Sequence, residues 1–371
     1  SSNPTGAMAI LDDVPDSPLL VLGMSGGTLL VMSRIYDDSE GYTWDCIKQL
    51  SLPSAPLSLA VSTHGANSRS KYPMLAAGLE DGEVALLDAT GTNVSNSDDR
   101  PPYSPFHFLR AHDDNGVPVS QLHFHWCYSS DKGGRQLHLA IVSGSLLRVA
   151  NMSTFEVFYA YHSGSSICDI RFCPYGPERI LVANDSGITE SVTWKPWQFI
   201  YGENSFHSLH SRFQPNIPST LKDGRRTSTT IDQAQFAGVF QSAVKSLSFA
   251  GDSNSLAVSC GSEVILCDSS SWLPSHDTEK RTPISRLKVD TDHPLEQVVY
   301  SSDTAWLAIT TQMKGSASVC DLILYSCSGT GDNIAAWKLQ HRRSLSSKGP
   351  SMCFSPTSQH LIVAENTTLL V

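Results

Sequence analysis

One short segment of this chain has the residue types of a serine hydrolase nucleophile. Residues 23–27 read Gly-Met-Ser-Gly-Gly, which fits the G-x-S-x-G pattern with Ser25 at its centre. That chemistry requires the serine on a strained turn between a strand and a helix, followed later in the chain by an acidic residue and a histidine. Here the next five residues are Thr-Leu-Leu-Val-Met, which is a strand pattern. The sequence therefore predicts a glycine-rich hairpin turn, and a hydrolase using Ser25 is the least favoured function.

A second segment has metal-ligand residue types. His123, His125 and Cys127 alternate along an expected strand, so all three side chains share one face, and zinc accepts these ligand types. Three ligands on one strand, however, span about 13 Å, which is too far for one tetrahedral ion without a bulge. We therefore interpret the segment as a packed strand with histidines at a seam or rim, and we predict no metal site.

Other catalytic patterns are missing from the sequence. It contains no P-loop, no dinucleotide-binding glycine motif and no H-E-x-x-H zinc motif. Nothing singles out a pair of carboxylates for acid–base work. We expect no catalytic residues, no cofactor and no enzymatic activity.

Two arginine pairs precede serines. Arg225-Arg226 stands before Ser228, and Arg342-Arg343 stands before Ser346, as in sites for basophilic kinases. Phosphorylation there would add a charge of about −2 beside arginines. Ser228 and Ser346 are therefore candidate phosphorylation sites; solvated turns, or a local phosphate-binding edge, are the alternatives.

Composition restricts the class of protein. The 371 residues include 26 Lys and Arg against 36 Asp and Glu, a net charge of −10, which argues against a large nucleic-acid-binding face. Hydrophobic residues make up 40%, enough for a core, and no apolar run approaches the ~18 residues of a membrane span. The nine cysteines are odd in number and form no C-x-x-C pair, which indicates a reducing compartment, the cytoplasm or the nucleus.

Short apolar runs of Val, Leu and Ile, separated by Gly, Ser, Asp, Asn or Pro, predict an all-β chain with almost no helix. The strands repeat: residues 83–88 read Glu-Val-Ala-Leu-Leu-Asp, and residues 263–268 read Glu-Val-Ile-Leu-Cys-Asp. Each copy follows a small-residue strand and a tight turn. Residues 351–356 and 168–174 similarly repeat the pattern of residues 244–249.

This repeated unit resembles the WD40 repeat, which has a period of roughly 40–45 residues and four strands per propeller blade. Asp88 and Asp268 stand where that family places the Asp of its Trp-Asp pair, with Leu87 and Cys267 in place of the Trp. His112 matches the family's Gly-His corner, with Ala111 for the glycine. The resemblance implies a structural role for Asp88, Asp268 and His112. Strand sets begin near residues 7, 56, 117, 166, 244, 295 and 350, so we expect a seven-bladed β-propeller of four-stranded antiparallel blades.

We expect residues 1–371 to form this single propeller domain. Residues 195–232 do not fit the repeat and form a long polar insertion, expected to project and to be partly mobile. The first blade owns its own first strand near residues 7–11, and the last blade is incomplete at Val371. We therefore expect the native chain to continue, or another chain to supply a strand.

The function that follows is a non-catalytic protein–protein interaction scaffold within a larger complex. Propellers expose loops on two faces, so we expect protein partners at those faces and at residues 195–232, and neither a membrane nor nucleic acid. The alternative is a regulatory or sensor propeller attached to a catalytic region outside this segment.

Overall fold

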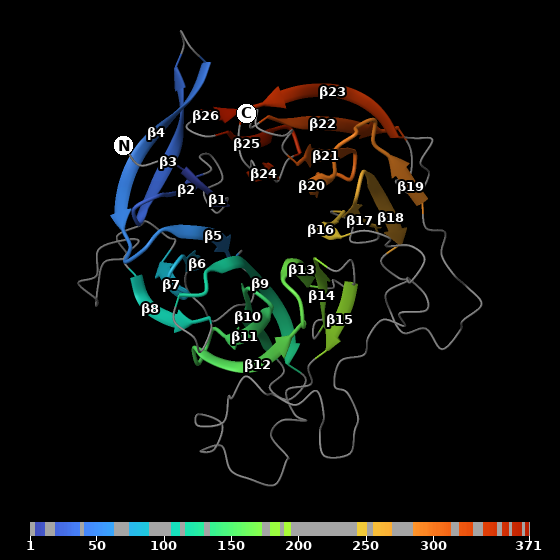
Figure 1. Cartoon of the computed structure of the whole chain (residues 1–371). Coiled ribbons are helices and arrows are strands. Elements are labelled where there is room, and N and C mark those ends of the chain that lie inside the picture. Colours follow the sequence, from blue (N-terminus) through green and yellow to red (C-terminus); the bar gives the residue numbers. More distant parts are fainter. Residues whose placement is uncertain are drawn as a thin grey trace, which may run out of the picture. The chain divides into compact units, whose positions relative to one another are not determined.

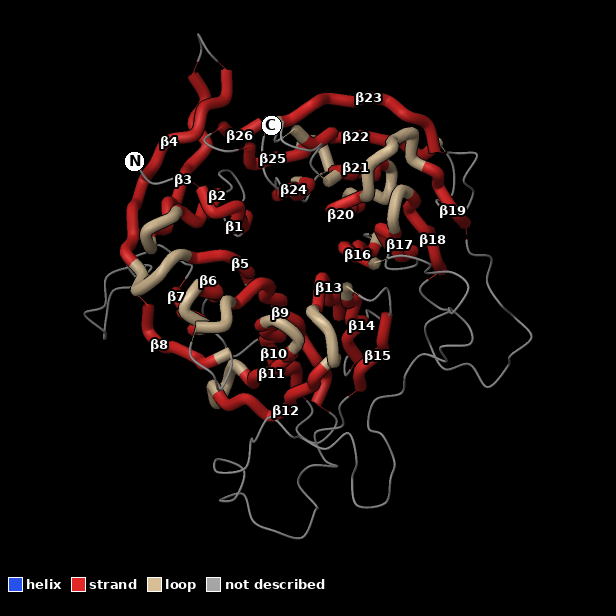
Figure 2. The backbone as a smooth tube through the Cα atoms, viewed as in Figure 1, coloured by secondary structure: helices blue, strands red, loops and turns tan. Residues whose placement is uncertain are grey.

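The computed structural model shows a chain built from β-strands. It describes residues 4–11, 19–37, 41–62, 74–88, 105–111, 116–129, 134–172, 179–185, 189–193, 243–250, 255–268, 285–312, 319–328, 337–346, 351–355, 358–365 and 368–370. No helix in these ranges is long and apolar enough to cross a membrane. The predicted all-β class is confirmed for the described residues (Figure 2).

Five sheets have four strands each, and the strands of each sheet neighbour one another in chain order or its reverse. They are β1(Pro4–Leu11), β2(Leu19–Met24), β3(Thr28–Asp37) and β4(Gly41–Ser51); β5(Pro56–Val61), β6(Met74–Leu79), β7(Glu83–Asp88) and β8(Pro105–Arg110); β9(Val119–Ser129), β10(Gly134–Ser143), β11(Leu146–Asn151) and β12(Glu156–His162); β16(Val244–Phe249), β17(Ser255–Cys260), β18(Glu263–Asp268) and β19(Ser285–Lys288); and β20(Leu295–Tyr300), β21(Trp306–Thr311), β22(Cys320–Cys327) and β23(Trp337–Leu345). This up-and-down antiparallel order is that of propeller blades (Figure 1).

Two further sheets have three described strands. They are β13(Ile167–Phe172), β14(Arg179–Asn184) and β15(Thr189–Thr193), and β24(Ser351–Phe354), β25(Leu361–Glu365) and β26(Thr368–Leu370). Strand β1 pairs with β2, so the N-terminal strand belongs to the first sheet, as the sequence predicted.

The predicted internal repeat is visible in the strand positions. Residues 83–88 form β7 and residues 263–268 form β18, each the third strand of its sheet. The strands before them, β6 and β17, are buried along their whole length. Sheets covered on both faces need apolar residues at nearly every position of the central strands, which explains why these runs do not alternate.

The chain divides into two compact units: Ser1–Gly144, Val149–Glu156 and Ile362–Val371 form one, and Ser145–Arg148 with Val157–Leu361 form the other. In the first unit, strands β2 and β3 contribute Val21, Leu29 and Val31 to a core shared with Leu75 and Leu87 of β6 and β7. In the second unit, one apolar cluster joins β14 to the β16–β18 strands, and another joins the β16–β19 sheet to the β20–β23 sheet. Face-to-face packing of successive sheets therefore builds the core of each unit.

The first strands of three sheets each have a polar residue at their third position, directly after a β-bulge. The register of pairing shifts immediately before Ser58 in β5, Asp169 in β13 and Ser246 in β16. Such a bulge re-aims the side chain that follows it. The Ser58 hydroxyl donates to the carbonyl of Val119 on the next sheet at 3.1 Å, and the Asp169 carboxylate accepts from the amide of Leu247 on the next sheet at 2.6 Å.

Ser246 continues this pattern within the second unit. Its hydroxyl lies 3.3 Å from the carbonyl oxygen and 3.2 Å from the amide nitrogen of Val298 on β20. Each hydrogen bond of this kind is worth about 1 kcal/mol, and losing one partner leaves a buried polar group unsatisfied. We call the first strand of each sheet its inner strand. These hydrogen bonds therefore fix the position of the inner strands of neighbouring sheets relative to each other.

Candidate protein-interaction surface

We call the last strand of each four-stranded sheet, in chain order, its outer strand. The outer strand β23 is the most exposed strand among those whose burial the structure describes. Seven consecutive residues, 338–344, are exposed between buried Trp337 and buried Leu345. No other strand has more than three consecutive exposed residues within the described positions. We call residues 338–344 the exposed β23 segment.

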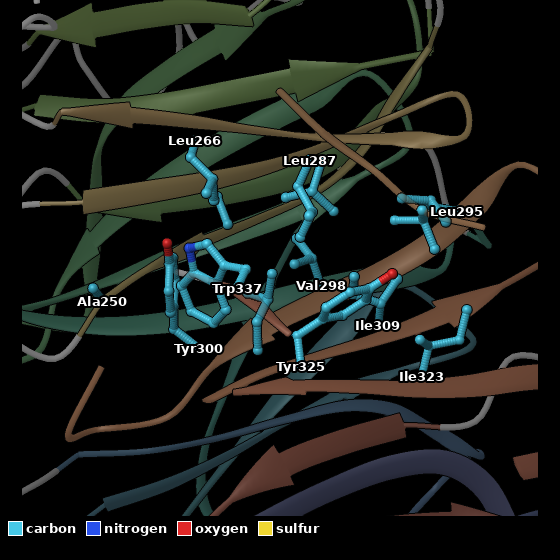
Figure 3. Packing of buried hydrophobic residues seen from close by; sticks show 14 residues of the cluster. Ala250, Leu266, Leu287, Leu295, Val298, Tyr300, Ile309, Ile323, Tyr325 and Trp337 are labelled. Carbon is cyan, nitrogen blue, oxygen red and sulfur yellow. The ribbon is translucent and has the colours of Figure 1, made fainter. Parts of the chain in front are cut away.

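Both ends of this strand are anchored in the core. Trp337 is 6% exposed, and its ring centroid lies 5.8 Å from that of Tyr300, with the rings inclined by 56°. Figure 3 shows the Trp337 ring beside Tyr300, within the cluster that contains Leu266 of the neighbouring sheet. Leu345 is fully buried at the other end. Since truncating a buried Trp costs about 3–5 kcal/mol, the strand ends are firmly held.

The middle of the strand is held by one buried carboxylate. Asp321 of β22 is 3% exposed and accepts hydrogen bonds from Arg342 Nη2 at 2.6 Å and from the Ser344 hydroxyl at 2.9 Å. The hydrogen bond to Asp321 raises the pKa of Arg342 above its ordinary value. Arg342 Nη1 also donates to the carbonyl of Asp290 at 2.9 Å. Arg342 is therefore a structural residue whose charge is met by Asp321.

A β-bulge interrupts the pairing of β22 with β23. Leu324 pairs with His341 and Tyr325 pairs with Leu339, so Gln340 is the extra residue. The Gln340 side-chain amide donates to the Ser326 hydroxyl at 2.7 Å. The bulge changes which side chains of β23 share a face.

The exposed β23 segment combines positive charge with an apolar side chain. Lys338 and Arg343 are exposed and form no ion pair with a described residue. Leu339 between them is 50% exposed. Other outer strands also carry large exposed apolar residues, Ile47 of β4 at 54% and Phe108 of β8 at 41%. The outer strands, unlike the central ones, therefore present apolar surface to solvent.

The WD40-like positions fall only partly within the described residues. Asp88 and Asp268 are the last residues of β7 and β18, which are equivalent strands, but their side chains are outside the description. His112 follows Ala111, whose amide donates to the carbonyl of Gly82 at 3.0 Å; His112 itself lies outside the described residues. The structural role of all three remains a prediction.

Of the two candidate phosphorylation sites, only Ser346 lies within the described residues. Ser346 is exposed, one residue past the end of β23 and three residues after Arg343. Ser228 and the expected insertion at residues 195–232 lie outside the described residues.

The Ser25 motif is a hairpin turn. Residues 25–27 connect β2 with β3, and Met24 pairs directly with Thr28. Gly26 and Gly27 have φ angles of 81° and 78°, the left-handed region that suits glycine. The predicted hairpin is confirmed, so the motif lacks the strand-to-helix turn that a nucleophile elbow requires.

The His123–Cys127 segment lies in β9, where Cys127 is 2% exposed. On β10, His138 pairs directly with His125. Burial lowers the pKa of His125 to about 4, and burial together with the His125 charge lowers the pKa of His138 to about 4. No group of three or more metal-ligating side chains gathers anywhere in the described ranges. The histidines form a cross-strand pair that stays neutral at physiological pH.

Sequence reasoning missed two sets of residues. The inner-strand residues Ser58, Asp169 and Ser246 share only their position, third in each first strand, and a polar side chain among apolar ones. The exposed β23 segment could have been noticed because seven residues there include only one apolar side chain, Leu339.

The fold has solved counterparts. The chain is similar to the structure of U3-55K, with a TM-score of 0.58 and 13% identity over 99% of this chain and 89% of that one. It is also similar to a chain in the crystal structure of the mitotic checkpoint complex, with a TM-score of 0.54 and 13% identity over 95% of this chain and 85% of that one. At the level of sequence, neither a protein-family profile nor a curated protein matches. The chain thus has the fold of the WD40-type β-propellers, as the repeat pattern predicted.

Proposed function

We propose that this chain is a non-catalytic protein-interaction scaffold, a subunit or module of a larger complex. The observation that carries the proposal is the exposed β23 segment: its seven residues are all exposed, yet the strand is held by buried Trp337, Leu345 and Asp321. Such a strand adds little buried apolar area of its own, so its rigidity serves recognition rather than the core. One of the similar solved structures is that of a multiprotein complex.

We further propose that the blades number seven. Five four-stranded sheets and two three-stranded sheets of the described residues begin close to the seven positions expected from the sequence. A fourth strand on each three-stranded sheet would complete the set. An experimental structure of the native protein that contained six or eight blades would contradict this count.

An intracellular location is part of the same proposal. Cys127, Cys260, Cys267 and Cys320 are buried thiols, and none of the eight described cysteines is in a disulfide. Buried thiols of this kind behave as small hydrophobic residues in a reducing compartment. A fluorescent fusion should therefore localise to the cytoplasm or nucleus; a secreted product would contradict the proposal.

The scaffold function is tested by purification at native expression level. The tagged wild type should elute from a native extract well above its monomer mass of 40.3 kDa, together with a reproducible set of proteins. Leu339→Asp should lose part of that set, whereas Phe108→Asp, which adds the same charge to another outer strand, controls for general surface effects. A monomer without companions, or a measurable activity abolished by Ser25→Ala, would refute the proposal.

A further inference from the structure

We propose that the exposed β23 segment binds an acidic, extended peptide segment of a partner protein, which pairs with β23 as an added strand. This inference rests on the proposed scaffold function and names the chemistry of the partner. It follows from three features of β23. One edge of the strand is not paired with another described strand, the bulge places basic side chains on one face, and buried contacts hold the strand in place.

The first feature is the edge itself. Strand β23 is the last in the order β20-β21-β22-β23, and its pairing with β22 runs from Trp337 to Leu345. This pairing uses one edge of the strand, and no other described strand pairs with the opposite edge. An outer edge presents a row of backbone donors and acceptors, which is the template used when an extended peptide is added to a sheet.

The second feature is produced by the bulge. Side chains that lie directly opposite each other in an antiparallel pair share a face of the sheet. Lys338, His341 and Arg343 pair with Ser326, Leu324 and Leu322, which are spaced by two along β22 and so share one face. In an unbroken strand Lys338 would point to the face opposite Arg343; the extra residue Gln340 brings it onto the same face.

The other face of β23 is used differently. Leu339, Arg342 and Ser344 pair with Tyr325, Ile323 and Asp321. All three of these β22 residues are buried, whereas on the first face Leu322 is buried and Leu324 and Ser326 are half-buried. Arg342 and Ser344 are occupied by the Asp321 carboxylate there. The charges of Lys338 and Arg343 are therefore the ones left to meet a ligand, with the His341 ring between them.

Charge complementarity selects an acidic partner. The segment contains no Asp or Glu, although acidic residues outnumber basic ones by ten over the whole chain. Charges on edge strands oppose pairing with strands of like charge. Two copies of β23 would bring Lys338 and Arg343 of each chain together, so a second copy is disfavoured, whereas carboxylates on alternate residues of an added strand would meet them.

The third feature reduces the cost of binding. Trp337, Leu345 and the Asp321 hydrogen bonds hold the strand in its paired conformation before a peptide arrives. A preformed edge loses little conformational entropy on binding, so most of the ordering cost falls on the peptide.

The test uses the full chain and a fluorescent peptide of about ten residues in which Glu alternates with Val or Thr. Fluorescence anisotropy at low salt should detect binding, and the affinity should fall as salt is raised because the contacts are exposed. Lys338→Glu/Arg343→Glu should weaken binding at least tenfold. The matched control is Arg286→Glu/Lys288→Glu, the same charge change on the outer strand β19, which should alter the affinity less than twofold.

Two further probes separate strand addition from simple attraction. The same peptide N-methylated at alternate residues keeps its charges but cannot pair, and should bind at least tenfold more weakly. A peptide with Lys in place of Glu should not bind. Equal binding of the N-methylated peptide, equal loss in both double variants, absence of binding, or dimerisation of the chain through β23 would each overturn the proposal. Failure here with an intact native complex would leave the scaffold function standing.

Discussion

The cross-strand pair of His125 and His138 should make this protein lose stability in mild acid. Burial lowers the pKa of each ring to about 4, below the 6.5 of an exposed histidine. Between pH 6.5 and 4 the unfolded chain therefore binds more protons than the folded chain. Stability rises with pH wherever the unfolded state binds more protons, so in this window it falls as the pH is lowered.

The magnitude follows from the width of that window. Each pH unit below 6.5 costs about 1.4 kcal/mol per histidine that stays neutral in the folded state. At pH 5, still above the folded pKa of about 4, the loss is about 2 kcal/mol for each histidine and about 4 kcal/mol for the pair. This is a large part of the 5–15 kcal/mol that stabilises typical domains. Above pH 7 the contribution of the pair to pH dependence should vanish.

The assay is urea denaturation followed by tryptophan fluorescence at pH 7.5, 6.5, 5.5 and 5.0. The double variant His125→Gln/His138→Gln should be less stable at pH 7.5 but should lose about 4 kcal/mol less than the wild type on going to pH 5. Gln340→Ala, which replaces a residue without a titratable group on the exposed β23 segment, should keep the wild-type pH dependence. If the wild type and the double variant lose the same free energy between pH 7.5 and 5, the His125–His138 pair does not cause the acid sensitivity.

Three other predictions follow from local geometry. Gly27→Ala should destabilise the chain by about 2 kcal/mol more than Gly26→Ala in thermal melts, because both glycines have positive φ but only a Cβ at position 27 meets a backbone carbonyl, at 2.5 Å. Asp169→Ala should cost about 3 kcal/mol in urea titrations, because two buried amide groups lose their acceptor; an unchanged midpoint would contradict the inner-strand account. Ser346 should be phosphorylated in vitro by a basophilic kinase, with loss of incorporation in Ser346→Ala and a reduction in Arg343→Ala; incorporation elsewhere only would exclude this site.

The strand architecture could be predicted because each strand carries its own signal. Short apolar runs bounded by turn residues indicated strands. The similarity of residues 83–88 and 263–268, which share four of six residues, indicated equivalent third strands, which β7 and β18 are. The glycine-rich turn at Ser25 was predicted correctly for the same local reason, since a strand pattern followed it at once. Local patterns determine such elements without knowledge of their neighbours.

The candidate interaction surface could not be predicted, because it depends on the register in which β22 pairs with β23. Arg342 and Arg343 are adjacent in sequence and looked equivalent, but the register sends Arg342 to Asp321 and leaves Arg343 in solvent. The bulge at Gln340, which aligns Lys338 with Arg343, is a property of two strands and has no signature in one. The pairing of His125 with His138 is likewise a matter of register.

The scaffold account is tested most directly by comparing what copurifies with the wild type and with Lys338→Glu/Arg343→Glu at native expression level, after circular dichroism and melting curves show that both fold alike. A defined partner should be present with the wild type, lost with this double variant, and retained with Arg286→Glu/Lys288→Glu. An identical set of companions for all three proteins would contradict the assignment of β23 as the interaction surface.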